Sequence, residues 1–112
     1  MSKRDAGVLL EDIRDAMRKV SSYIDGMDLA AFMADEKTVD AVIRNIGVIG
    51  EAAKQLPEDF KAAHPEIPWH QVAGMRNRLI HDYAGVDLEI VWQVASAALP
   101  AMAAEISRIK TD

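Results

Sequence analysis

The stretch over residues 35–56 reads DEKTVDAVIRNIGVIGEAAKQL. Its apolar residues recur at spacings of three and four, which places them on one face of a helix that opens at Asp35 and stops at Pro57. Gly47 and Gly50 each cost such a helix about 1 kcal/mol relative to alanine. Their presence predicts that the backbone of another element passes close to this helix. The predicted buried face consists of Val39, Val42, Ile43, Ile46, Ile49, Gly50 and Ala53.

Similar apolar stripes on either side of this stretch predict three more long helices. The first covers residues 5–25, and Gly26 ends it. The third opens at Pro68, and the fourth starts after Asp87, which is a good N-cap. Pro100 lies inside the fourth helix, where it leaves a carbonyl without its usual donor and predicts a kink.

Two of the connections contain short helical turns. Asp28 can cap one over residues 29–33, and Pro57 begins another with acidic residues in its first turn. The sequence shows no strand signals, internal repeats or low-complexity segments. Four helices with short connections predict an all-α fold, an up-and-down four-helix bundle with short extra helical turns. The length predicts one domain over residues 1–112.

The composition favours a protein of the reducing cytoplasm. There are no cysteines, which excludes disulfides and thiolate metal sites. Charged residues interrupt the N-terminal region, so no signal peptide is expected. No apolar run approaches the roughly 20 residues that span a bilayer. We therefore expect a cytoplasmic protein that does not enter the membrane.

The net charge is −5, which argues against broad, non-specific binding to nucleic acid. Residues 41–81 lack the acidic excess of the segments before and after them, with five Lys and Arg against four Asp and Glu. A basic pocket on an acidic body would suit a specific RNA contact. An ordinary mixed surface would have the same composition, so charge alone does not separate the two.

Residues 75–87 read MRNRLIHDYAGVD and form a polar cluster at the end of the third helix, which Gly85 stops. Metal-free cleavage of RNA uses the neighbouring 2′-hydroxyl as nucleophile, and it needs a base, an acid and a cation. Histidine, which titrates near neutrality, can serve as base and acid, and arginine forks onto phosphate oxygens. His81 and Arg76 match these needs. No carboxylate cluster or histidine spacing suits a metal ion, so no metal site is expected.

Arg76, His81 and Tyr83 fit the pattern Arg-x4-His-x-Tyr, and a Gly-Val-Asp turn follows them. Together with the runs GEAAK at residues 50–54 and LEIVW at 88–92, this pattern resembles the HepT-like toxins of the HEPN superfamily. The resemblance implies a small all-helical ribonuclease encoded beside an MntA-like nucleotidyltransferase antitoxin. It implies the toxin of a HepT/MntA-type toxin–antitoxin system, a metal-independent endoribonuclease that cuts tRNA or mRNA and needs no cofactor.

The resemblance also implies a role for each residue of the cluster. Arg76 would stabilise the charge that builds on the phosphoryl oxygens, and His81 would move protons. The antitoxin would transfer AMP from ATP to the hydroxyl of Tyr83, which would block the RNA site with bulk and negative charge. Asn77 and Glu51 are candidates for lining the same site.

Helix geometry places a condition on this site. Arg76 and His81 point about 140° apart on an ideal helix, whereas Arg76 and Tyr83 lie about 20° apart. The first two side chains cannot share a pocket if one helix runs straight through both. Either the helix loosens before His81, or the site draws residues from two chains. The resemblance favours a homodimer with paired motifs around a shared cleft, in which a second His81 supplies both an acid and a base.

The same residues also allow a purely structural interpretation. Arg76 could form a salt bridge with Glu51 or Asp82. His81 could be a favourable charge at a helix C-terminus, and Tyr83 could be a core aromatic with a hydrogen-bonded hydroxyl. On that interpretation the protein is a non-catalytic helical module that binds a nucleotidyltransferase partner or a nucleotide.

Overall fold

Helices form most of the protein in the computed structural model, which describes residues 5–81 and 85–109. The all-α class predicted from the sequence is confirmed. Two strands of two residues each, β1 (Ile80–His81) and β2 (Gly85–Val86), lie between the sixth and seventh helices. The helices are α1 (Ala6–Tyr23), α2 (Leu29–Ala34), α3 (Glu36–Gln55), α4 (Glu58–Ala63), α5 (Trp69–Ala73), α6 (Met75–Leu79), α7 (Leu88–Gln93), the π-helical segment η1 (Val94–Ala98) and α8 (Leu99–Ile106).

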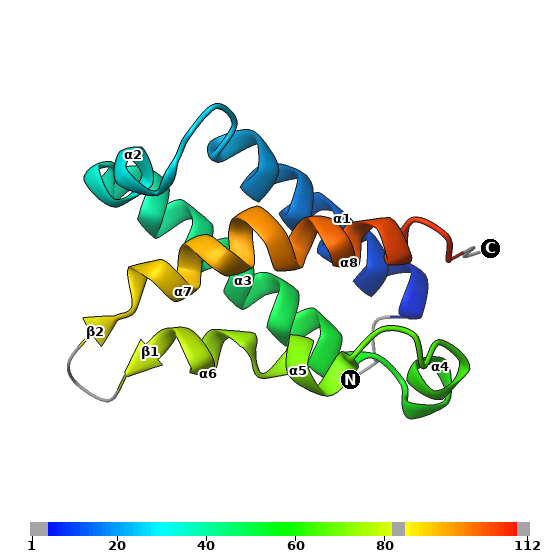
Figure 1. Cartoon of the computed structure of the whole chain (residues 1–112). Coiled ribbons are helices and arrows are strands. Elements are labelled where there is room, and N and C mark those ends of the chain that lie inside the picture. The colour runs from blue at the N-terminus through cyan, green and yellow to red at the C-terminus, as the bar shows by residue number, and fades with distance from the viewer. Residues whose placement is uncertain (1–4, 82–84, 110–112) are drawn as a thin grey trace.

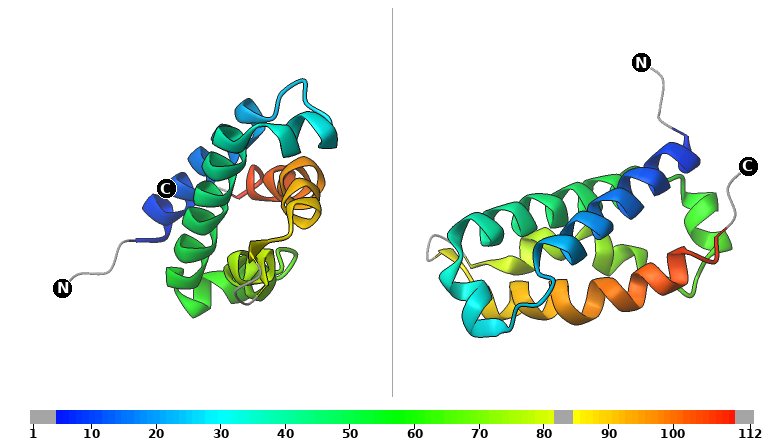
Figure 2. Two further views of the ribbon diagram at one scale, coloured as in Figure 1. Left: turned by 90° about the vertical axis from the view of Figure 1, so that its left-hand side faces the viewer. Right: turned by 90° about the horizontal axis from the view of Figure 1, so that it is seen from above.

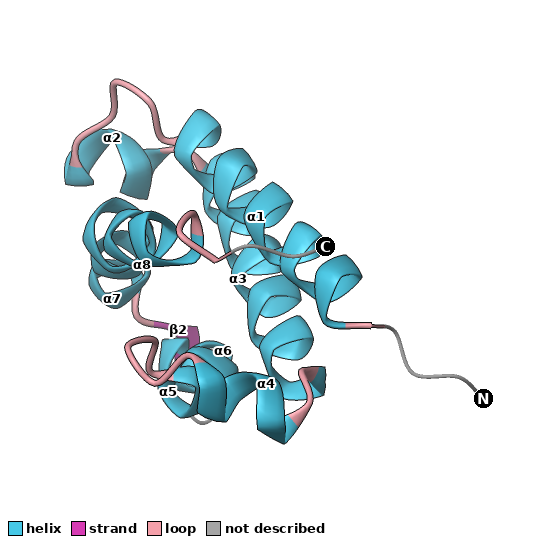
Figure 3. Cartoon of the chain, turned by 90° about the vertical axis from the view of Figure 1, so that its right-hand side faces the viewer, coloured by secondary structure: helices cyan, strands magenta, loops and turns pink. Residues whose placement is uncertain are grey.

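The α1–α3 pair is the framework on which the other helices lie (Figures 1 and 2). α7, η1 and α8 form one continuous rod against this pair, and α5 with α6 forms a second rod. Seen from the end, the α7–α8 rod lies between α2 and the α5–α6 rod (Figure 3). Across residues 5–81 and 85–109, none of the helices combines the length and apolarity that a membrane crossing demands. α3 contacts α1, α5, α6 and α7, which makes it the element on which a site can be assembled.

Aspartates begin four of the helices. The carboxylates of Asp5, Asp28, Asp35 and Asp87 accept hydrogen bonds from first-turn backbone N–H groups at 2.8 to 3.3 Å. These bonds satisfy donors that have no partner within the helix. At Asp35 the hydroxyl of Thr38 donates a further bond at 2.8 Å. The hydroxyl and the backbone N–H of Thr38 together hold the pKa of Asp35 below its ordinary value of 3.8.

The core is one apolar cluster between the α1–α3 pair and the two rods. The face that the sequence assigned to the interior of α3 is buried, with Ile43 half-buried. In the described part of the chain, Asn45 is the one buried polar side chain, and its Nδ2 donates to the carbonyl of Ala41 at 2.8 Å. The rings of Phe32 and Trp92 lie 5.3 Å apart and join α2 to α7. The polar chemistry therefore lies on the surface of the bundle.

The two glycines of α3 each have a close neighbour, but the neighbours differ. A Cβ on Gly50 would lie 3.2 Å from the carbonyl oxygen of Ala73 and 3.4 Å from that of Val72, so the predicted approach of another backbone is confirmed there. A Cβ on Gly47 would instead lie 3.3 Å from Cδ of Arg76. The prediction was wrong for Gly47, because a side chain and not a backbone crosses it.

The third predicted helix is broken, and it ends earlier than the sequence indicated. Gly74 separates α5 from α6, and its carbonyl accepts hydrogen bonds from the backbone N–H groups of Asn77 and Arg78. α6 then ends at Leu79, well before Gly85. The apolar spacing continues across Gly74, so the pattern alone could not show that the hydrogen-bonded ladder restarts there.

A short β-ladder replaces the expected end of that helix. Ile80 pairs with Val86 and His81 pairs with Gly85, and the N–H of Asp87 donates to the carbonyl of Leu79 at 3.0 Å. Gly85 has a φ of +103°, which suits glycine. Two residues per strand are too few to show the alternation that marks a strand in sequence, which is why no strand was predicted.

The fourth predicted helix contains a widened turn just before Pro100. Residues 94–98 are π-helical, and the N–H of Leu99 donates to the carbonyl of Val94, five residues earlier. Proline has no N–H to donate, and a wider turn moves the backbone that its ring would otherwise contact. The irregularity predicted at Pro100 therefore takes the form of a π-helical turn.

Candidate active site

Arg76 lies across α3 at the point where that helix has no side chain. Its Cδ and Nε lie 3.3 and 3.6 Å from the position that a Cβ on Gly47 would occupy. Gly47 thus leaves room for the aliphatic part of the Arg76 side chain. It lies where α6 contacts α3, which we call the α3–α6 seam. Gly50 lies about one turn further along α3, and its missing side chain lets the backbone of α5 approach α3 closely. This approach brings α6, which follows α5 in the chain, next to Gly47.

The guanidinium group stands in an open groove with a volume of about 450 Å³. Glu51 and Arg44 of α3 line the groove together with Arg76, and so does Asp12 of α1. The side chain of Glu51 accepts a hydrogen bond from Nε2 of Gln55 at 3.3 Å. The predicted site residues Arg76 and Glu51 are therefore brought together.

Arg76 is exposed and forms no hydrogen bond or ion pair with any residue that the structure describes. The structural interpretation in which it pairs with Glu51 is wrong, although the two share a groove. The alternative partner, Asp82, lies outside the described residues. An unpaired guanidinium in a concave surface keeps its donors available for a phosphate, which it can hold with two parallel hydrogen bonds.

His81 belongs to β1, two residues after α6 ends. The helix therefore stops before His81, which is one of the two conditions that the angular argument required. Because the backbone is extended there, the angle of about 140° expected on a continuous helix no longer applies. The side chain of His81 and the whole of Tyr83 lie outside the described residues, and their roles stay predictions.

Asn77 lines a different hollow from its neighbour Arg76. This second hollow has a volume of about 750 Å³ and lies between α3, α4, α5 and α6. Lys54, Lys61 and His70 line it together with Asn77. The structure thus places Asn77 in a different hollow from Arg76 and Glu51, and its part in the same site stays a prediction.

The residue that sequence reasoning underrated is Gly47. The pattern identified it as a packing glycine, yet it positions the candidate catalytic arginine. The sequence feature that could have revealed this role is a glycine three residues before Gly50, at the edge of the apolar face of α3. Among residues 5–81 and 85–109, no group of three or more His, Asp or Glu side chains is placed to hold a metal ion.

A family model described as "Ribonuclease HepT-like" matches residues 13–109, which include the whole α3–α6 seam. The chain belongs to the ribonuclease HepT-like family. The resemblance drawn from Arg76, His81 and Tyr83 is confirmed at the level of the family.

Relatives of this HepT-like chain match along nearly all of their own length. "Probable ribonuclease HepT" of Thermococcus cleftensis is 39% identical over 108 residues, which are 96% of this chain and 98% of the relative. "Putative RNase MJ0127" of Methanocaldococcus jannaschii is 40% identical over 112 residues, 100% of this chain and 93% of the relative. "Putative RNase TTE0752" of Caldanaerobacter subterraneus subsp. tengcongensis is 33% identical over 100 residues, 89% of each chain. No solved structure was found to match the chain.

Proposed function

We propose that this HepT-like protein is a metal-independent endoribonuclease in which Arg76 and His81 act on one RNA phosphate. The observation that carries the proposal is an exposed, unpaired guanidinium held in a groove over Gly47, on a helix that ends just before His81. The family and the names of its members support the same reaction class.

The proposed reaction is an internal displacement at phosphorus. His81 takes the proton from the 2′-hydroxyl, the 2′-oxygen bonds to phosphorus, and the bond from phosphorus to the 5′-oxygen breaks. The leaving 5′-oxygen takes a proton from an acid, and the product ends in a cyclic 2′,3′-phosphate. Arg76 forks onto the non-bridging oxygens, whose negative charge grows in the transition state.

One imidazole cannot be the base that takes the 2′-hydroxyl proton and the acid that protonates the 5′-oxygen in the same step. The reaction therefore needs a separate acid. We assign this role to His81 of a second copy, which makes the active unit a homodimer with paired motifs around one cleft. Light scattering combined with an RNA cleavage assay tests this assignment. A stable monomer that cleaves RNA at the rate of the unfractionated protein would exclude it.

The biological role that fits this reaction is the toxin of a HepT/MntA-type system acting on tRNA or mRNA. An MntA-like nucleotidyltransferase would transfer AMP from ATP to Tyr83, forming a phosphodiester on the tyrosine oxygen and releasing pyrophosphate. The bulk and negative charge of AMP, two residues from His81, would keep RNA from the groove.

The decisive experiment is a cleavage assay in the presence of a chelator. Wild-type protein, Arg76→Ala and His81→Ala are purified identically and incubated with single-stranded RNA. We expect cleavage by the wild type and a loss of at least about 100-fold in each variant, because Arg76→Ala removes a donor to the developing charge and His81→Ala removes the group that transfers protons. Equal cleavage by all three proteins would mean a contaminant, and it would favour a module that binds a nucleotidyltransferase or a nucleotide without cutting RNA.

The modification is tested by mass spectrometry after incubation with the partner nucleotidyltransferase and ATP. The peptide that contains Tyr83 should gain one or more AMP units, and RNA cleavage should fall in parallel. Tyr83→Phe keeps the ring and removes the acceptor oxygen, so it should gain no mass. A mass gain retained in Tyr83→Phe would place the modification elsewhere.

A further inference from the structure

The second hollow, between α4 and α5, collects basic side chains from separate elements. Lys54 comes from α3, Lys61 from α4 and His70 from α5, and Asn77 of α6 lies beside them. Glu58 is the one acidic side chain in its lining among the described residues. In a chain with a net charge of −5, this concentration of basic groups in one concave surface is a feature to which the proposed cleavage step assigns no role.

The basic side chains of this hollow are not held in strong ion pairs by the described residues. Lys61 has a side chain that is only 17% exposed, so packing positions its stem, and its Nζ lies 3.1 Å from the carboxylate of Glu58. The side chain of Glu58 is 93% exposed, and a pair with such a solvated carboxylate is weak. Lys54 and His70 are exposed and form no ion pair with any residue that the structure describes.

The hollow adjoins the groove that holds Arg76. Lys54 follows Gly47 by seven residues, which on a helix is two turns on the same face and about 10 Å. Between them, Gly50 lies against the backbone of α5. Asn77 follows Arg76 directly on α6, so the two hollows share the same short helix as a common border. Because α6 borders both hollows, a strand of a few nucleotides bound at Arg76 can extend toward the hollow that Lys54 and Lys61 line.

The aromatic rings beside the hollow are already occupied by the fold. Trp69 is buried, and its Nε1 donates to the carbonyl of His64 at 3.0 Å. The ring of Phe60 lies 6.1 Å from that of Trp69 and 4.8 Å from that of His64. The indole of Trp69 is thus not presented for stacking on bases, and the imidazole of His70 is the one exposed ring in the described lining. Recognition in this hollow would depend on charge and not on base identity.

We propose that this hollow binds phosphates of single-stranded RNA that flank the phosphate held by Arg76. Lys54 and Lys61 carry most of the attraction, and Asn77 contributes a polar contact at the border between the two hollows. The position of the hollow relative to the cleaved bond rests on the proposed ribonuclease function. The contact is with the sugar–phosphate backbone, so it extends the bound length of RNA without selecting a sequence.

The test measures binding separately from cleavage. The probe is a fluorescein-labelled, mixed-sequence 2′-O-methyl RNA strand, which lacks the nucleophilic hydroxyl and cannot be cut. Fluorescence anisotropy is recorded at several salt concentrations for wild type and for Lys54→Gln/Lys61→Gln. The control is Lys19→Gln/Lys37→Gln, which removes two exposed lysine charges from α1 and the start of α3.

The variant of the hollow should bind about tenfold more weakly than wild type near 0.1 M salt. The slope of log K against log salt should become shallower by about 1.4, because each lost phosphate contact on a single strand removes about 0.7. The control should bind with the slope of the wild type. Equal slopes for all three proteins, or equal losses in the two double variants, would overturn the proposal.

Cleavage assays on the same proteins separate this proposal from the ribonuclease function. If the wild type cuts unmodified RNA but Lys54→Gln/Lys61→Gln binds the probe normally, the proposed phosphate site is wrong and the ribonuclease function stands. If the wild type binds the probe through Lys54 and Lys61 but cuts nothing, the phosphate site stands and the ribonuclease function is wrong. Lys54→Gln alone, at an exposed position, tests whether the effect arises from misfolding around Lys61, and it should weaken binding by itself.

Discussion

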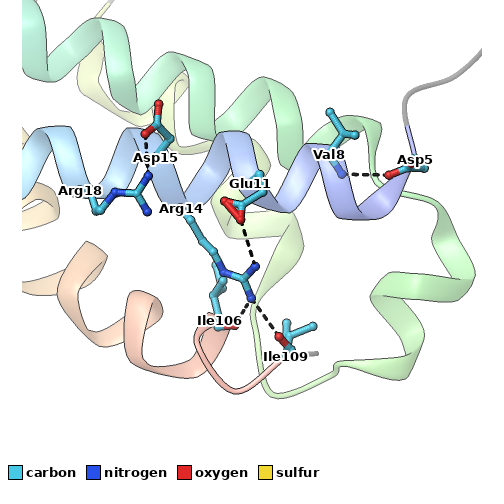
Figure 4. Close-up of polar contacts among 8 residues, drawn as sticks. All are labelled: Asp5, Val8, Glu11, Arg14, Asp15, Arg18, Ile106 and Ile109. Atoms are coloured by element: carbon cyan, nitrogen blue, oxygen red, sulfur yellow. Dashed lines mark hydrogen bonds and ion pairs between the residues drawn. The ribbon is translucent and has the colours of Figure 1, made fainter. Parts of the chain in front are cut away.

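Arg14 and Arg76 show how one residue type serves two purposes in this bundle. Figure 4 shows Arg14 directed at the carbonyls of Ile106 and Ile109. Its Nη2 donates to them at 3.1 and 2.9 Å, and its side chain is 23% exposed. Arg76 is exposed, lies over Gly47, and bonds to no residue that the structure describes. Both side chains lie at seams between helices, yet only the second keeps its donors free.

The difference shows which of the two seams leaves a charged donor without a partner among the described residues. At the α1–α8 seam the arginine donates to two carbonyls at and just beyond the end of the last helix, one of which, that of Ile106, also accepts from the backbone N–H of Ile109 at 3.0 Å. Its charge is committed to holding the C-terminal turn against α1. At the α3–α6 seam the arginine bonds to no residue of the described fold, so its donors remain available to a ligand outside the fold. Variants at the two seams should therefore affect different properties.

The largest effect is expected for Arg76→Met, which keeps the stem over Gly47 and removes the charge. The value of kcat/KM for RNA cleavage should fall about 100- to 1000-fold, because a donor to the developing phosphate charge is lost. The free energy of unfolding in urea should change by no more than about 0.5 kcal/mol, as for other exposed substitutions. Arg78→Met removes the same charge from the same short helix and should leave cleavage near the wild-type rate. Equal losses in both variants would assign the effect to α6 in general.

Arg14→Met should show the opposite pattern. Two hydrogen bonds from a charged donor disappear, and the carbonyls of Ile106 and Ile109 lose a partner, so unfolding should become easier by about 1 to 3 kcal/mol. RNA cleavage below the melting transition should stay at the wild-type rate. Urea denaturation and the cleavage assay together check this. A fall in cleavage without a fall in stability would break the contrast between the two arginines.

Substitutions of the two glycines of α3 should separate effects on stability from effects on cleavage within the α3–α6 seam. Gly50→Ala places a methyl group 3.2 Å from a backbone oxygen, which cannot swing away, so it should destabilise the protein by about 1 to 2 kcal/mol despite the better helix propensity of alanine. Gly47→Ala meets the flexible stem of Arg76, so stability should change by less than about 1 kcal/mol. The displaced guanidinium should nevertheless lower cleavage several-fold. Urea denaturation and cleavage rates measure both effects, and a Gly47→Ala protein with normal cleavage would remove Gly47 from the site.

The smallest effect concerns Asp35, which caps α3 far from Arg76. The pKa of this carboxyl is lowered in the folded protein, so its contribution to stability is present above its ordinary value of 3.8. The contribution is lost as the pH falls through the lower folded-state pKa. Asp35→Asn should therefore lose less stability than the wild type between pH 5 and that range, while cleavage at neutral pH stays unchanged. Parallel pH profiles of unfolding for the two proteins would contradict this assignment.

The sequence predicted best those features that depend on one residue and its immediate neighbours in the chain. Asp28, Asp35 and Asp87 cap the helices that they were expected to begin, because a short carboxylate next to free N–H groups needs no distant partner. Gly50 was correctly identified as a point of close backbone approach. The break at Gly74 could not be predicted, because the apolar spacing runs through it without interruption.

The sequence predicted which residues belong to the candidate site. It did not predict that they line two separate hollows. Arg76 and Glu51 do share a groove, and Asn77 lies in the neighbouring hollow. The helix ends at Leu79, so the angle between Arg76 and His81 that assumed one continuous helix no longer applies. The roles of His81 and Tyr83 stay predictions from the family motif.

The helical class, the caps and the residue types that could act on a phosphate were predictable from the amino-acid sequence, since these follow from local spacing and side-chain chemistry. The tertiary structure decided which arginine is free. Arg14 and Arg76 look alike in the sequence, and only the packing of α8 against α1, and of α6 against a glycine of α3, commits one and leaves the other available. That choice depends on contacts between residues far apart in the chain, which local patterns do not encode.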